Sequence, residues 1–429
     1  MISFSTLRPG AVGPETELLQ TGLIRAGFLS GEVDGIFGKE TLAALRRFQQ
    51  SVGLTPDGVA GPATWHALYP YLTGYVLYMV QPGDTLYRIA ERYGTALHAM
   101  ETANPKVDPF RLSVGSHLTV PLPFEVVPIN IRFTSDVLAL CVEGLRARYP
   151  FLGAGTVGNS VMGKPIPYLT MGAGENQVLF NGTHHANEWI TSMLLMKYLE
   201  NYAAAYAREG KIAGTDAGDL ARKTSLFVVP MVNPDGVDLV TGRLSSGTYY
   251  EQAVSLAEGY PDIPFPNGWK ANIAGIDPNL QYPAGWENAR EIKYRLGYTK
   301  PGPRDFVGPA PLAAPESRSL YQFTLAHNFS ITLSYHSQGE VIYWKYLDYL
   351  PENSYQIAQQ FGEVSGYTVE LVPPESTYAG YKDWFILRYD RPGYTIEVGK
   401  GASPLPLSQF PKIYGDNEGL LTLALSVTA

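Results

Sequence analysis

The chain has 429 residues, of which 45% are hydrophobic and 17% charged, and its formal net charge is −8. This length exceeds what one ordinary hydrophobic core supports, so we expect two or three domains, and the hydrophobic content excludes a mainly disordered chain. The acidic balance argues against a nucleic-acid partner, because such proteins use basic patches to neutralise phosphates.

The cysteine content and the length of the apolar runs exclude further classes of protein. The single cysteine, Cys141, excludes an internal disulfide and a multi-thiolate metal site, and its apolar surroundings predict a packed thiol. No segment reaches the roughly 18 apolar residues of a membrane span, and the first thirty residues show no signal peptide. We therefore expect no membrane span, and the route of export stays open.

The first segment, residues 1–73, is expected to form a small helical bundle. Its apolar residues recur at helical spacing in two runs. Two Asp-Gly turns, at residues 34–35 and 57–58, are followed by Thr41 and Thr64, which suit helix N-caps.

The fuller motif set of this segment closely resembles the peptidoglycan-binding domain found at the ends of bacterial wall hydrolases. The motifs that carry the resemblance are Leu19-Gln20, Asp34-Gly35-Ile36-Phe37-Gly38, Phe48-Gln49, Gly53-Leu54, Asp57-Gly58 and Gly61-Pro62 with Trp65. The resemblance implies that the segment binds peptidoglycan, whereas a helical mini-bundle would explain only the periodicity.

The second segment, residues 74–124, predicts the order strand, helix, helix, strand from its turn and cap residues. It resembles a LysM module in the motifs Gly83-Asp84-Thr85-Leu86, Ile89-Ala90, Asn104-Pro105 and Val114-Gly115. The resemblance implies binding to the N-acetylglucosamine-containing backbone of peptidoglycan or chitin. A linker mini-domain without a ligand is the alternative.

The third segment, residues 125–429, alternates apolar strands with longer helical patterns. The strands lie near residues 177–180, 225–230, 330–335 and 393–398, and the helices at 188–207 and 355–364. This alternation predicts an α/β domain with a mixed central sheet flanked by helices, whose active residues lie at strand ends.

The richest chemistry lies in residues 180–189, between a strand and a helix. His185 and Glu188 offer the imidazole nitrogen and carboxylate oxygen that suit Zn²⁺. The spacing alone is weak evidence, because His98 and Glu101 repeat it inside the LysM-like segment. Only the later pair follows a buried strand and a glycine turn.

A catalytic zinc site needs a third protein ligand and an open position. His336 closes a predicted strand, and although a lone histidine there is more often structural, the His185–Glu188 pair favours it as a ligand. His184 stays an alternative ligand, because it stands four residues before Glu188.

Taken in order, these motifs resemble the zinc carboxypeptidase family, which includes the pancreatic carboxypeptidases and bacterial wall-peptide relatives. The resemblance spans the third segment and implies one zinc ion per chain, held by His185, Glu188 and His336. It also assigns Glu397, in the predicted strand at 393–398, as the general base. A buried salt bridge is the alternative role for Glu397, since a carboxylate in an apolar strand is costly unless paired or used.

The resemblance assigns further roles around this site. Lys270, just after a tryptophan, would polarise the scissile carbonyl, and Asp277 would accept a hydrogen bond from the far nitrogen of His185. Asn279 is expected to bind substrate. Leu280 departs from the family, because carboxypeptidases usually have there an arginine that clamps the terminal carboxylate.

That departure weakens the anchor for a free C-terminus. It favours the wall-specific branch, which resembles γ-D-glutamyl-meso-diaminopimelate peptidase and cuts the stem peptide. In the specificity-loop region, Lys382 is expected to pair with a substrate carboxylate or to face solvent. Tyr378 or Tyr381 would supply the family's mobile tyrosine, and Lys400 is a further candidate for anion contact.

Three functions remain open from the sequence. The preferred one is a zinc peptidase of peptidoglycan stem peptides, targeted by two wall-binding modules. A general metallocarboxypeptidase and a non-catalytic wall-binding protein are the alternatives, and the complete set of ligands and base disfavours the latter. The modules imply a cell-wall or extracellular location, and the missing signal peptide leaves a cytoplasmic or spore-associated one possible.

Overall fold

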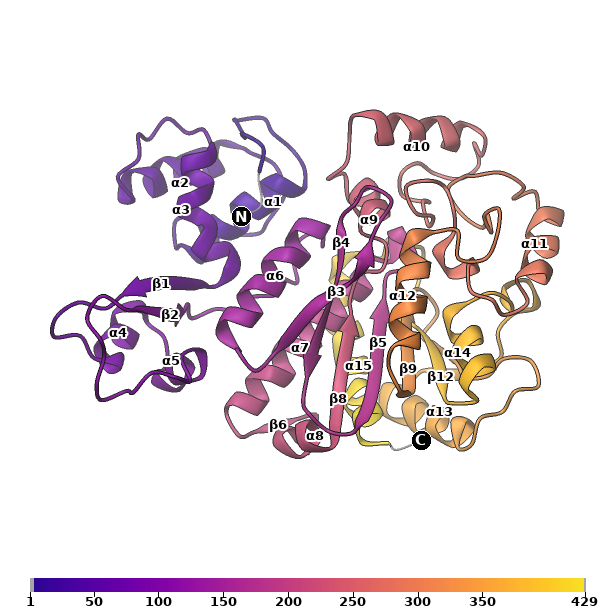
Figure 1. Cartoon of the computed structure of the whole chain (residues 1–429). Coiled ribbons are helices and arrows are strands. Elements are labelled where there is room, and N and C mark those ends of the chain that lie inside the picture. Colours follow the sequence, from indigo (N-terminus) through magenta and orange to yellow (C-terminus); the bar gives the residue numbers. More distant parts are fainter. Residues whose placement is uncertain (1–3, 428–429) are drawn as a thin grey trace. The chain divides into compact units, whose positions relative to one another are not determined.

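The computed structural model describes residues 4–427, which fall into two compact units (Figure 1). The first runs to Arg132 and also takes in Asp136–Gly153, and the second holds Phe133–Ser135 and Ala154 onwards. These units do not follow the boundaries expected at residues 73/74 and 124/125, which stay predictions. Within residues 4–427, no helix is both long and apolar enough to span a membrane.

The N-terminal part of the first unit is the predicted helical bundle, built from two similar halves. Its helices are α1 (Pro14–Arg25), α2 (Lys39–Ser51) and α3 (Pro62–Thr73). In the first half, Gln20 Nε2 donates to Asp34 Oδ1 at 2.7 Å and to Thr41 Oγ1 at 3.1 Å. Gln49 Nε2 repeats this with Asp57 at 2.8 Å and Thr64 at 3.1 Å.

The N-cap role predicted for the two threonines is wrong. Gly38 and Gly61 cap α2 and α3, and Thr41 and Thr64 are each the third helical residue. The physical reason is the buried glutamine amide, which donates to each threonine hydroxyl from the preceding helix. The threonines therefore join helices instead of starting them.

The LysM-like part has the predicted order of strand, helix, helix and strand. The elements are β1 (Tyr75–Met79), α4 (Leu86–Tyr93), α5 (Leu97–Ala103) and β2 (His117–Pro121), with β1 and β2 antiparallel. Thr85 caps α4 by accepting from Arg88 N at 3.2 Å. Helix α6 (Ser135–Arg148) also belongs largely to the first unit, and on it Cys141 is buried as predicted.

The second unit is organised around an eight-stranded mixed sheet in the order β11-β10-β12-β9-β5-β8-β4-β3. The strands are β3 (Gly153–Asn159), β4 (Pro165–Met171), β5 (Asn176–Gly182), β8 (Thr224–Val229), β9 (Phe329–His336), β10 (Val341–Tyr343), β11 (Thr368–Glu370) and β12 (Gly393–Glu397). The four central strands β12, β9, β5 and β8 are mutually parallel. A separate hairpin joins β6 (Lys211–Ile212) and β7 (Thr215–Asp216).

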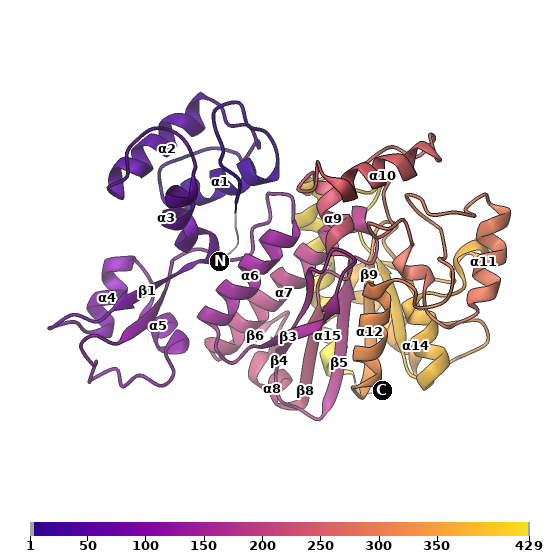
Figure 2. The same cartoon turned by 45° about the horizontal axis from the view of Figure 1, so that its top comes forward.

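Helices cover both faces of the sheet, which confirms the predicted α/β class. Helices α12 (Pro315–Leu325) and α14 (Tyr381–Tyr389) lie on one face, and α15 (Phe410–Ser426) lies on the other with α7 (Ile190–Ala207) (Figure 2). Helix α13 (Ser354–Ser365) packs against α15. The remaining helices are α8 (Ala217–Lys223), α9 (Pro234–Thr241), α10 (Thr248–Glu258) and α11 (Trp286–Arg295).

Parallel strands place the candidate residues at one edge of the sheet. Strands β5, β9 and β12 end at Gly182, His336 and Glu397, and Glu397 lies in register with His336. Because the carboxyl ends of parallel strands meet at the same edge, residues more than 200 positions apart in the chain become neighbours.

Candidate metal centre and active-site pocket

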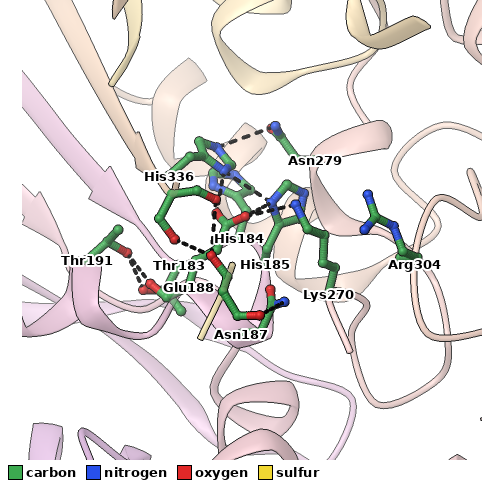
Figure 3. Close-up of polar contacts among 12 residues, drawn as sticks. Thr183, His184, His185, Asn187, Glu188, Thr191, Lys270, Asn279, Arg304 and His336 are labelled. Carbon is green, nitrogen blue, oxygen red and sulfur yellow. Dashed lines mark hydrogen bonds and ion pairs between the residues drawn. The ribbon is translucent and has the colours of Figure 1, made fainter. Parts of the chain in front are cut away.

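Three donors converge at this edge of the sheet. Suitable atoms of His185, Glu188 and His336 all lie within 4.8 Å of one another. Glu188 Oε1 is 2.9 Å from His185 Nδ1, and its Oε2 is 2.9 Å from His336 Nδ1 (Figure 3). The two Nδ1 atoms face each other at 3.2 Å. Two imidazole nitrogens and a carboxylate directed at one point form a donor set that fits Zn²⁺.

The local backbone explains why His185 and Glu188 point the same way. A 3-10 turn, Ala186–Glu188, follows His185 and precedes α7. His185 is the N-cap of this turn and Glu188 is its third residue, and the side chains at these two positions lie close together. The preceding Thr183 has a left-handed φ of 57°, and its hydroxyl lies 2.7 Å from the hydroxyls of Thr191 and Ser192.

His184 lies outside this donor group. Its side chain is fully buried, and its Nε2 lies 3.0 Å from the Tyr282 hydroxyl. Burial holds the pKa of His184 well below its ordinary value, and the neighbouring imidazoles His336 and His185 lower it further. His184 is therefore a neutral core residue in this arrangement, and the alternative ligand set gains no support.

Asp277 holds the opposite side of the His185 ring. Its Oδ1 lies 3.3 Å from His185 Nε2, and its Oδ2 accepts from Asp305 N at 3.2 Å. Burial by itself would lower the pKa of His185, but the carboxylates of Glu188 and Asp277 raise it to about 9. This imidazole is thus protonated at neutral pH until a cation replaces the proton.

Lys270 approaches the same centre from a different loop. Its Nζ lies 3.0 Å from Glu188 Oε1, and its backbone oxygen accepts from Ala186 N at 3.1 Å. Burial would lower the pKa of Lys270, but the Glu188 carboxylate raises it above its usual value. The ammonium is therefore a fixed positive charge beside the metal donors.

Glu397 lines the same cavity as His185 and His336. Burial raises the pKa of its carboxyl to about 8, and the Glu188 carboxylate adds to the shift. Within residues 4–427 the Glu397 carboxyl has no ion-pair partner, so the salt bridge considered from the sequence is not formed.

The expected substrate-binding residues have different surroundings. Tyr378 lines the cavity, but Tyr381 is 1% exposed in the core, where its hydroxyl lies 2.9 Å from Thr324 Oγ1. Tyr381, the first residue of α14, packs among other aromatic side chains, so of the two tyrosines it is Tyr378 that lies at the cavity. Asn279 Nδ2 lies 3.4 Å from His336 Nε2 at the cavity wall.

Lys382 lines the cavity but is already paired. Its Nζ donates to the carboxylate of Asp383 and, at 2.7 Å, to the backbone oxygen of Lys345. The side chain is 4% exposed, so the solvent-facing alternative is wrong. Lys400 is exposed and pairs with Glu340 at 2.8 Å.

Among the charged residues of the cavity wall that sequence reasoning missed are Arg304, Asp305 and Lys293. Arg304 Nε donates to Asp305 Oδ2 at 2.5 Å, and Lys293 Nζ lies 2.6 Å from Asp305 Oδ1. They belong to a glycine- and proline-rich stretch at residues 297–311 and to the end of α11, where no periodic pattern points to a site. The adjacent Arg-Asp pair in that stretch is the one signal that was available.

Comparison with known proteins confirms all three predicted resemblances. The zinc carboxypeptidase model matches residues 141–418, the peptidoglycan binding domain model residues 12–68 and the LysM domain model residues 78–121. The γ-D-glutamyl-L-diamino acid endopeptidase 1 of Lysinibacillus sphaericus is 38% identical over 401 residues, covering 81% of this chain and 99% of the relative.

Two further matches extend the comparison. The uncharacterized protein YqgT of Bacillus subtilis is 41% identical over 281 residues, covering 65% of this chain and 73% of the relative. The crystal structure of carboxypeptidase A from Helicoverpa armigera superposes with a TM-score of 0.52 at 17% identity, covering 80% of this chain and 81% of that one. The latter likeness concerns the fold.

Proposed function

The chain belongs to the zinc carboxypeptidase family and is a metallopeptidase with two peptidoglycan-binding modules, and on this premise we propose that it hydrolyses the γ-D-glutamyl–diamino acid bond of peptidoglycan stem peptides. The observation that carries the proposal is the convergence of His185, Glu188 and His336 beside a cavity that His185 and His336 line together with Glu397. The endopeptidase name of the Lysinibacillus sphaericus relative supports the choice of bond.

In this proposal His185, Glu188 and His336 hold one zinc ion per chain. When bound, zinc supplies Lewis acidity and a water molecule more acidic than bulk water. Glu397 accepts a proton from water as the water oxygen adds to the scissile carbonyl carbon, and it delivers that proton to the leaving amine as the C–N bond breaks. Its apolar surroundings suit this exchange, because a carboxyl of raised pKa binds and releases a proton near neutrality.

The fixed charges around the centre have separate roles. Lys270 supplies positive charge for the oxygen of the scissile carbonyl as it becomes negative. Asp277 orients the His185 ring through its far nitrogen, 3.3 Å away. Leu280, 8% exposed, offers no charge for a terminal carboxylate, so cleavage does not require a free C-terminus at the next residue.

The N-terminal modules direct the enzyme to its polymer. A module that holds glycan raises the local concentration of stem peptides around the catalytic unit without any new contact at the active site. We therefore place the enzyme at the cell wall or at the spore peptidoglycan, where the glycan and the peptide occur together.

A defined stem tetrapeptide, L-Ala-γ-D-Glu-diaminopimelate-D-Ala, tests this function. The zinc-loaded protein is expected to release L-Ala-D-Glu and diaminopimelate-D-Ala, identified by mass, and a chelator is expected to stop the release. Removal of single C-terminal residues from ordinary peptides, with the tetrapeptide intact, would instead establish a general carboxypeptidase.

A further inference from the structure

The active-site cavity has four cationic side chains in its wall, and three of them are occupied. Lys270 pairs with Glu188, Lys293 with Asp305 and Lys382 with Asp383. Each of these ammoniums has its single nitrogen at a carboxylate, so it has no second nitrogen with which to form a parallel pair of hydrogen bonds to a substrate carboxylate. The fourth cation, Arg304, differs in the way it is held.

Arg304 contacts its carboxylate with one nitrogen only. Its Nε donates to Asp305 Oδ2 at 2.5 Å, and within residues 4–427 its Nη1 and Nη2 atoms have no hydrogen-bond partner. The side chain is 38% exposed, so solutes reach it. In Figure 3 the guanidinium lies beside Lys270, on the same side of the site as His185, and all three residues line the cavity. The free fork has the planar geometry that matches a carboxylate with two parallel hydrogen bonds.

The position of this guanidinium is tied to the metal donors. Asp305 has a left-handed φ of 63°, and its backbone N–H donates to Asp277 Oδ2 at 3.2 Å. Asp277 in turn lies 3.3 Å from His185. Lys293 holds the second oxygen of Asp305 from α11. The arginine is therefore held in place relative to the metal donors through Asp305 and Asp277.

The proposed substrate supplies the matching group. A glutamyl residue linked through its γ-carbonyl keeps a free α-carboxylate, and diaminopimelate on the other side of the bond keeps the carboxylate of its second carboxyl group. Leu280, at the position where carboxypeptidases usually have the clamping arginine, cannot bind either group. We infer that Arg304, through its free Nη1–Nη2 fork, binds a substrate carboxylate and selects acidic stem peptides. This inference rests on the proposed function.

The test combines Arg304→Gln with substrates that lack one carboxylate each. The stem tetrapeptide is compared with one peptide amidated at the glutamyl α-carboxylate and another amidated at the diamino acid. For the wild-type enzyme, one amidation is expected to lower kcat/KM about 10- to 100-fold, mainly through KM, because the carboxylate has the same charge in substrate and transition state. Arg304→Gln is expected to lose as much with the unmodified peptide and nothing further with the amidated one.

The identity of the sensitive peptide decides which carboxylate the arginine binds. Arg304→Lys keeps the charge without the fork and is expected to recover part of the loss, and its melting temperature is compared with that of the wild type to show that it folds. The matched control is Arg295→Gln, which replaces an exposed arginine on α11 whose side chain is 69% accessible. This variant is expected to behave as wild type.

Two results would overturn these ideas separately. If wild-type enzyme cleaves the tetrapeptide but Arg304→Gln keeps the full discrimination against the amidated peptides, the role of Arg304 is excluded and the proposed function stands. If zinc-loaded wild-type enzyme cleaves none of the three peptides, the proposed function itself fails.

Discussion

The chain contains the pattern His-x-x-Glu in two places with opposite outcomes. His98 and Glu101 lie on the ordinary helix α5, where both side chains are exposed. His185 caps a 3-10 turn, Ala186–Glu188, that follows a buried parallel strand and ends at Glu188, and His336 ends a neighbouring strand. Among the described residues, no third metal-binding side chain joins the first pair.

The difference shows what a ligand spacing lacks. Three residues of separation put two donors on one face in either kind of helix. Only the sheet brings a third donor and buries most of the group. Sequence context, a buried strand before the pair and a second strand ending in histidine, therefore distinguishes a metal centre from a solvated helix face.

The largest difference is expected from removing the histidine of each His-x-x-Glu pair in turn. His185→Ala is expected to abolish zinc retention and lower kcat/KM by about 1000-fold or more, because the site loses a ligand and the metal's several kcal/mol of transition-state stabilisation. His98→Ala is expected to change neither quantity. Metal content by atomic emission and tetrapeptide cleavage measure both, and equal behaviour of the two variants would refute the assignment.

Glu397→Gln separates chemistry from metal binding. The amide cannot accept the proton of water, so kcat is expected to fall about 100- to 10,000-fold while zinc content stays at the wild-type level. Glu101→Gln provides the matched change in the other region and is expected to be silent. Retained turnover by Glu397→Gln would exclude this carboxyl as the general base.

Asp277→Ala tests the carboxylate that holds the His185 ring, a contact for which, within the described part of the chain, the pair His98 and Glu101 has no counterpart. The loss of the carboxylate beside His185 Nε2 is expected to weaken zinc binding about 10- to 100-fold, as is usual for groups that orient a ligand. Competition with a chelator of known affinity measures the change. Unaltered affinity would show that the His185 ring is held by other contacts.

The raised pKa of His185 predicts that zinc binding depends on pH. Because Glu188 and Asp277 raise the pKa of His185 to about 9, a proton competes with zinc below that pH. Apparent zinc affinity is therefore expected to rise up to about tenfold per pH unit from pH 6 towards 9 and then to level off. Chelator competition at pH 6, 7 and 8 gives the slope, and a flat profile would contradict the protonated imidazole.

Much of this architecture was predictable, because it follows from strong local patterns. The strands around the site are apolar runs, and parallel packing makes their ends meet, so order and context favour the convergence of His185 and His336, whereas Glu397 is assigned from the family resemblance. The two helix-pair motifs of the N-terminal bundle were also visible as repeated Asp-Gly turns.

The errors arose where side chains beyond a local window decide the outcome. The Asp-Gly turns before Thr41 and Thr64 favour a cap role. The glutamines that bind these threonines lie on earlier helices, outside the local window, so the turns alone do not reveal the contact. Tyr381 and Lys382 lie next to each other on α14, yet one packs into the core and the other pairs with Asp383 at the cavity. Arg304 belongs to an irregular loop, and only the fold places it beside Lys270.

The central claim is that two imidazoles and one carboxylate share one zinc ion, and zinc K-edge X-ray absorption of the purified protein tests it most directly. The expected spectrum shows two imidazole nitrogens and carboxylate or water oxygens around zinc, and the imidazole contribution should change in the His336→Ala variant if any metal remains. A spectrum with sulfur ligands, or one that is identical in wild type and His336→Ala, would contradict the account.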